Sequence, residues 1–120
     1  MKVVENLIRI EKLNDLTHNY SYRMVKGQKS FSISGDNVIV QTYGIEIERQ
    51  DICADGMVIN IERDSICIIS PQRHKVHNLL KMLYDNQVSP IHLLDVIGEY
   101  VDEYIIDFDN VSNETANGAQ

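Results

Sequence analysis

The sequence has few of the residues that mark a particular chemistry. Its 120 residues include no tryptophan, two prolines and two cysteines. Cys53 and Cys67 fit no CxxC pattern and lie in apolar surroundings, so we expect two buried free thiols rather than a disulfide or a redox pair. No run of about 18 apolar residues is present, which excludes a membrane-spanning helix.

Basic residues are missing from the last third of the chain. All 11 Lys and Arg lie before residue 82, together with 10 Asp and Glu, whereas residues 82–120 contain 8 Asp and Glu. The formal net charge is −7. An acidic segment of this kind repels phosphate groups, so we expect the protein to bind neither nucleic acid nor a membrane. It would attract a basic partner.

Signatures of catalysis and export are also missing. The chain has no nucleophile elbow, P-loop, dinucleotide-binding fingerprint or HExxH motif. We therefore assign no catalytic, cofactor-binding or metal-binding residue. Whether the protein is an enzyme stays open, and the missing signatures favour a non-enzymatic protein. Charged side chains between Lys2 and Lys12 interrupt any signal-peptide core, so we expect a cytoplasmic protein.

Residues 3–69 have the pattern of β-strands. Apolar and polar side chains alternate clearly at 18–26 and 45–48, which is typical of strands with one buried face. Residues 3–12 fit either a strand or a short helix. Gly44 lies inside the longest extended stretch, where a glycine often marks a bulge or a close backbone approach.

Turn signals divide this region into five or six strands. Such signals, rich in Gly, Asn and Asp, occur at 14–15, 26–29, 35–37, 55–56 and 63–64. All the connections are short, and short connections force neighbouring strands to be antiparallel. The sequence therefore predicts an antiparallel β-meander.

Two helices are expected to follow the strands. Both prolines directly follow serines, in Ser70-Pro71 and Ser89-Pro90, and this pair is typical of a helix start. We predict helices at 71–84 and 90–106, forming a hairpin that packs on one face of the sheet. Their apolar stripes consist of Val76, Leu79, Leu80 and Leu83 on the first helix, and of Leu94, Ile97, Val101 and Ile105 on the second, with Leu93 and Tyr104 on its flank.

The length of the chain indicates one domain of the α+β class. We place this domain at residues 1–109, with strands in 3–69 and helices in 71–106. Residues 110–120 read NVSNETANGAQ and have almost nothing to bury, so we expect a disordered tail.

The second predicted helix carries an acidic face. Asp95, Glu99 and Asp102 recur at i, i+4 and i+7, and Glu103 lies further round the helix. The simplest interpretation is a solvated surface. The alternative is a docking surface for a basic protein partner. In a more specific form of this alternative, the carboxylates mimic the phosphates of DNA.

Tyrosines and histidines provide the other candidate residues. Tyr20, Tyr22 and Tyr43 fit core packing, but they could instead line a ligand pocket between sheet and helices, with His77 or Cys67. His77 and a second histidine three residues earlier lie on one side of the first helix. We favour a solvated pair over a metal site, because both point away from the apolar stripe and lie near a lysine.

Two stretches resemble a known family. Tyr43-Gly44-Ile45-Glu46-Ile47, followed by a strand pair, and Val88-Ser89-Pro90 with Leu93-Leu94-Asp95-Val96-Ile97 are similar to a family of small proteins of unknown function from clostridia and related Firmicutes. The resemblance covers most of residues 18–106. It implies a bacterial cytoplasmic origin and carries over no catalytic residue.

Two functions from different classes are compatible with these features. The first is a non-enzymatic protein-interaction or regulatory module that uses the acidic helix face, with a homodimer as one form of partnership. We favour it because no catalytic signature is present and an edge strand of the sheet needs cover or a partner. The second is a small ligand-binding protein or small enzyme with a site between sheet and helices.

Overall fold

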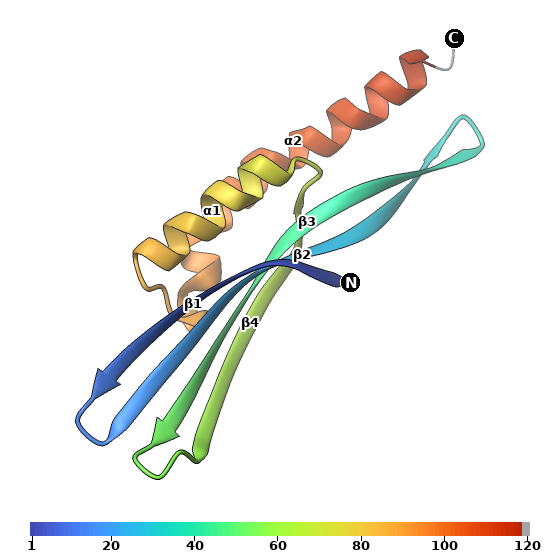
Figure 1. Ribbon diagram of the computed structural model, residues 1–120. Helices are drawn as coiled ribbons and strands as arrows, with labels where there is room; N and C mark the ends of the chain where they lie inside the picture. The colour runs from blue at the N-terminus through green and yellow to red at the C-terminus, as the bar shows by residue number, and fades with distance from the viewer. Residues whose placement is uncertain (119–120) are drawn as a thin grey trace.

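The computed structural model is an α+β fold in which four strands precede the helices (Figure 1). The strands are β1 (Lys2–Leu13), β2 (Leu16–Ile33), β3 (Asp36–Cys53) and β4 (Val58–Ser70). The helices are α1 (Arg73–Asp85), the short 3₁₀ helix η1 (Pro90–His92) and α2 (Leu93–Gly118). The structure describes the backbone of residues 1–118 and their side chains except those of Ile33 and residues 112–118.

The sheet has the order β1-β2-β3-β4 with every neighbouring pair antiparallel, so the predicted meander is confirmed. The prediction of five or six strands is wrong, because two of the expected turns lie inside strands. Gly27 pairs with Thr42 in the middle of β2, and Arg63 pairs with Glu48 in the middle of β4. Residues 3–12 form a strand within β1.

The close approach expected at Gly44 is confirmed. The pairing of β3 with β4 shifts between Tyr43 and Ile45, which marks a bulge opposite Gly44. A Cβ atom added at Gly44 would lie 2.2 Å from the backbone oxygen of Cys67. Only a residue without a side chain fits this position.

The core lies between one face of the sheet and the helices. Alternation along the strands turns Tyr22 and Met24 of β2 and Ile45 and Ile47 of β3 to this face, and all four are fully buried. The whole stripe predicted for α1 is buried against them, as expected: Val76, Leu79, Leu80 and Leu83.

The apolar stripe predicted for the second helix is partly wrong. Ile97 is buried, but the side chains of Leu94 and Ile105 are more than half exposed. The buried side of α2 consists of Leu93, Ile97 and Phe108 together with the partly buried Tyr104. We call these four residues the inner stripe. The second helix therefore packs with a rotation of roughly 60° relative to the one that its apolar pattern predicts.

The helix boundaries also differ from the prediction. α1 begins at Arg73 with Gln72 as its N-cap, and the Ser70 hydroxyl accepts a hydrogen bond from the Gln72 N–H just before the helix. Pro90 occupies the first position of η1, as expected, but Ser89 makes no side-chain cap. α2 continues to Gly118, so residues 110–118 are helical where a disordered tail is expected, and residues 119–120 lie outside the described part.

The molecule is elongated, with extents of 63 × 22 × 18 Å. Its hairpin of β2 and β3 is 18 residues long on each arm and runs beyond the other strands (Figure 1). Phe31, near the tip of β2, lies 6.2 Å from Phe108 of α2 between ring centroids. Phe31 and Tyr22 belong to opposite faces by alternation, so the twist of the hairpin presents its other face to α2 at Phe108.

Candidate functional site

The acidic face of α2 is on the surface. The side chains of Asp95, Glu99, Asp102 and Glu103 are all exposed. The one ion pair formed by these four within the described residues joins His92 Nδ1 to a carboxylate oxygen of Asp95 at 3.6 Å. The structure thus brings the four predicted partner-binding residues together on one exposed helix.

Asp107 fixes the orientation of this helix. The carboxylate is 4% exposed and accepts hydrogen bonds from Lys75 Nζ, at 2.8 and 2.9 Å, and from the Ser70 hydroxyl at 3.0 Å. One side chain of α2 is thereby tied both to the end of β4 and to α1. Unlike Asp95, Glu99, Asp102 and Glu103, Asp107 lies on the same side of the helix as Leu93 and Tyr104. This position is the sequence signal that could have identified it as a buried carboxylate.

The predicted ligand-binding tyrosines lie in the core. Tyr20, Tyr22 and Tyr43 are at most 9% exposed. The rings of Tyr20 and Tyr22 stack with centroids 6.0 Å apart, and the Tyr22 hydroxyl donates to the carbonyl of Val88 at 3.0 Å. Burial raises the pKa of the Tyr22 hydroxyl, so it stays protonated as a donor. These contacts indicate core packing.

His77 is separate from the tyrosines. Its exposed ring lies at the surface between α1 and β1, where Nδ1 is 2.8 Å from a carboxylate oxygen of Glu5. The neighbouring Arg73 and His74 complete a shallow cleft with these two residues. Among the described residues, no group of three or more His, Cys, Asp and Glu side chains has a geometry that could hold a metal ion.

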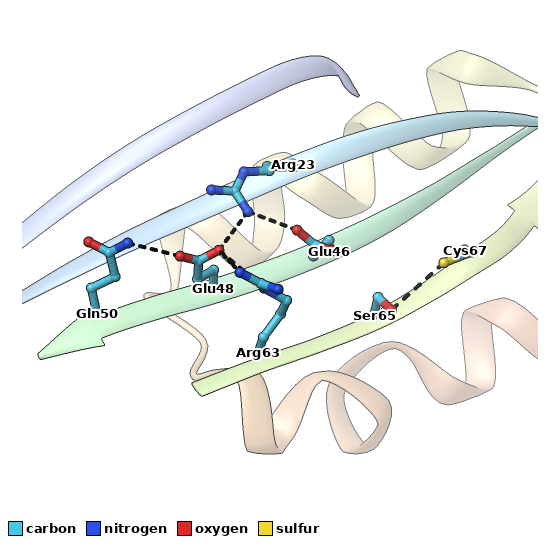
Figure 2. A network of polar contacts seen from close by, with 7 residues as sticks. All are labelled: Arg23, Glu46, Glu48, Gln50, Arg63, Ser65 and Cys67. Carbon is cyan, nitrogen blue, oxygen red and sulfur yellow. Dashed lines mark hydrogen bonds and ion pairs between the residues drawn. The ribbon is translucent and has the colours of Figure 1, made fainter. Parts of the chain in front are cut away.

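A charged network covers the sheet face opposite the helices (Figure 2). Arg23 donates to Glu46 at 2.8 Å and to Glu48 at 2.9 Å, and Arg63 donates to Glu48 at 2.8 Å. Gln50 supplies a further donor to Glu48 at 3.0 Å. Alternation places these residues on the face away from the buried Ile45 and Ile47.

Glu48 is the centre of this network. The side chain is 6% exposed, so its charge depends on the donors around it. The hydrogen bond from Arg23, helped by those from Arg63 and Gln50, outweighs the opposing effect of burial and lowers the pKa of Glu48 to about 2. The arginines and carboxylates of this network pair with one another, which indicates a structural role.

The cysteines are free and partly exposed, which corrects the expectation that both are buried. Cys67 belongs to the bulge opposite Gly44, and its Sγ donates to the hydroxyl of Ser65 at 3.7 Å (Figure 2). It lies outside the buried cluster that contains Tyr20, Tyr22 and Tyr43.

A second polar network was missed by sequence reasoning. His18 Nδ1 lies 2.6 Å from Asp51 Oδ1, and Asp51 also accepts from Arg49 at 3.0 Å and from Asn60 at 3.0 Å. Burial alone would raise the pKa of Asp51, but the hydrogen bonds from Asn60, Arg49 and His18 together hold it below its ordinary range. The residues come from three strands, so only the strand register reveals them.

Within residues 1–118, no helix is long and apolar enough to cross a membrane. A search of curated proteins and a search of solved structures found no match to the chain. A family model described as a family of unknown function (DUF6514) matches residues 1–103. This match includes the whole sheet, α1 and the first part of α2, and the chain belongs to the DUF6514 family.

Proposed function

We propose that the protein is a non-enzymatic interaction or regulatory module that binds a basic protein partner through the acidic face of α2. The observation that carries the proposal is the exposure of Asp95, Glu99, Asp102 and Glu103 on one helix whose orientation is fixed by Asp107. The absence of Lys and Arg after residue 81 strengthens the local negative potential.

The test is reversal of Asp95, Glu99 and Asp102 to lysine. All three side chains are exposed, so we expect the fold to persist and partner capture to be abolished. Tagged protein would be used for affinity capture from a lysate of the native host at low and moderate salt. A specific partner lost as the salt concentration rises is the expected result, because salt screens exposed charges.

The matched control reverses the same number of exposed carboxylates elsewhere. Asp15 lies in the connection between β1 and β2, Asp36 is the first residue of β3, and Asp64 lies on β4, all three exposed. Their joint reversal to lysine changes the net charge equally and should leave capture intact. If the α2 variant still captures the partner, or if both variants lose it equally, the acidic face is not the interface.

We also propose a cytoplasmic protein of clostridia or related Firmicutes, as the sequence resemblance implies. A homodimer is a second partner hypothesis, and sedimentation equilibrium of the purified protein tests it. The alternative function, a ligand site between sheet and helices, has less support. Tyr20, Tyr22 and Tyr43 pack within the core cluster, and His77 pairs with Glu5 outside it.

A further inference from the structure

α2 carries an apolar stripe whose two ends the fold leaves exposed. Leu94 and Ile105 are 63% and 61% exposed, and between them lie Gly98 and Val101, whose side chain is partly buried against the core. These four residues follow at steps of four, three and four, and they fall within about 60° of one another around the helix. This outer stripe has the spacing by which one helix packs against another.

The outer stripe points away from α1. Asp107, whose carboxylate binds Lys75, marks the side of α2 that faces α1. At roughly 100° per residue, Leu94, Gly98 and Ile105 lie about 140–180° from Asp107. The Lys75–Asp107 contact thus leaves the stripe on the opposite side of α2 from α1, where another chain can reach it.

Gly98 makes the centre of the stripe shallow. Apart from its chain neighbours and the nearby backbone of α2, the atoms of the described residues that lie within 4 Å of a Cβ built there belong to the Leu94 side chain, at 3.5 and 4.0 Å. No packing inside the protein therefore requires a glycine at this position. A glycine between exposed leucine and isoleucine side chains instead allows the backbone of a second helix to approach closely.

Carboxylates border the stripe along its length. Asp95, Asp102 and Asp109 are exposed and recur at intervals of seven residues, so they form a row parallel to the stripe. A partner helix would need apolar residues facing the stripe and Lys or Arg facing this row. A second copy of α2 does not meet this condition, because no Lys or Arg follows residue 81 and the two acidic rows would repel.

We propose that the outer stripe is the docking surface for a basic amphipathic helix of a partner protein. The inference rests on the proposed function and specifies the structure and chemistry of the partner. The apolar residues supply the contact, and the acidic row selects a helix with a basic flank.

The experiment uses a defined probe and the full chain. The probe is a labelled synthetic peptide of about 21 residues, with leucines at alternating steps of three and four and lysines beside them. A scrambled peptide of the same composition carries the same charge without an apolar face. Fluorescence anisotropy at moderate salt measures both affinities, and we expect the ordered peptide to bind at least about tenfold more tightly.

Two double variants separate apolar docking from charge attraction. Leu94→Ser with Ile105→Ser removes the exposed ends of the stripe without a charge change, and it should weaken binding of the ordered peptide by at least about tenfold. Val96→Ser with Ile106→Ser is the control, since both side chains are exposed on other faces of α2. It should change the affinity by less than about twofold.

Each contrary outcome has a distinct meaning. Equal binding of the ordered and scrambled peptides, or no effect of the Leu94 and Ile105 changes, overturns docking on the outer stripe, while the proposed acidic surface stands. If reversal of Asp95, Glu99 and Asp102 leaves peptide binding unchanged, the proposed function itself fails. A wild-type dimer that dissociates in the Leu94 and Ile105 variant would identify a second copy as the occupant and would also overturn the proposal.

Discussion

At Gly44 two strands approach so closely that no side chain fits between them. A Cβ atom there would lie 2.2 Å from a backbone oxygen and 2.4 Å from the oxygen of Ile66. Backbone atoms cannot rotate away as the end of a flexible side chain can. The residue type at this position is therefore set by the bulge in β4.

Gly44→Ala should destabilise the protein by at least about 3 kcal/mol, because the strands must separate to admit the methyl group. Gly98→Ala is the matched control, since its nearest contact would be an ordinary 3.5 Å from a side-chain atom of Leu94. Alanine at this helical position should stabilise the protein by about 1 kcal/mol. Urea unfolding followed by circular dichroism measures both changes in stability. Equal effects of the same sign would contradict the steric role assigned to Gly44.

At the scale of elements, α2 is fixed by apolar contacts and by one polar contact. Leu93, Ile97 and Phe108 supply the buried contact area. Asp107 adds specificity, because its carboxylate meets Lys75 and Ser70 only at one rotation of the helix. The choice between the two apolar stripes of α2 follows from this combination.

Asp107→Ala should cost about 2 kcal/mol, since the partly exposed Lys75 loses its partner but can still reach water. Asp109→Ala, two residues further along on the exposed side, should change the free energy of unfolding by less than about 0.5 kcal/mol. Limited proteolysis and urea unfolding provide the measurement. A cost for Asp107→Ala no larger than for Asp109→Ala would mean that the contact does not hold α2.

At the scale of the whole molecule, the shape follows from the strand lengths. The radius of gyration is 17.5 Å, whereas a compact domain of this length has about 14 Å. The long hairpin of β2 and β3 extends past the core, and α2 runs beside its far part through the contact of Phe108 with Phe31 (Figure 1). Because the helices cover only one face of the sheet and the molecule is elongated, much of its surface is open to solvent.

The stability of the whole fold should fall in acid through Glu48. The pKa of Glu48 is lowered from 4.5 to about 2, so its contribution is complete above pH 4.5 and is lost as the pH falls toward 2. The loss is about 3 kcal/mol. Glu48→Gln should be less stable than the wild type at neutral pH and nearly equal to it near pH 2.

Urea unfolding between pH 7 and pH 2 measures this difference. Glu103→Gln changes the net charge equally at an exposed position and should follow the wild-type pH profile. Parallel profiles of the wild type and Glu48→Gln across the whole range would show that Glu48 does not cause the acid sensitivity.

The sequence by itself determined the order of elements, the antiparallel pairing, the α1 stripe and the special role of Gly44. These follow from local alternation, short connections and the lack of a side chain, all of which act within a few residues. It also located the acidic face, because helical spacing places Asp95, Glu99 and Asp102 together wherever the helix packs.

Only the tertiary structure decided the number of strands, the rotation of α2 and the polar networks. Residues 26–29 carry turn signals, yet pairing with β3 across the sheet keeps β2 extended through them. α2 has an inner and an outer apolar stripe, and the contacts of Asp107 with Lys75 and Ser70, more than 30 residues away, select the inner one for burial. The bonds to Glu48 and Asp51 depend on strand register, which sequence spacing does not contain.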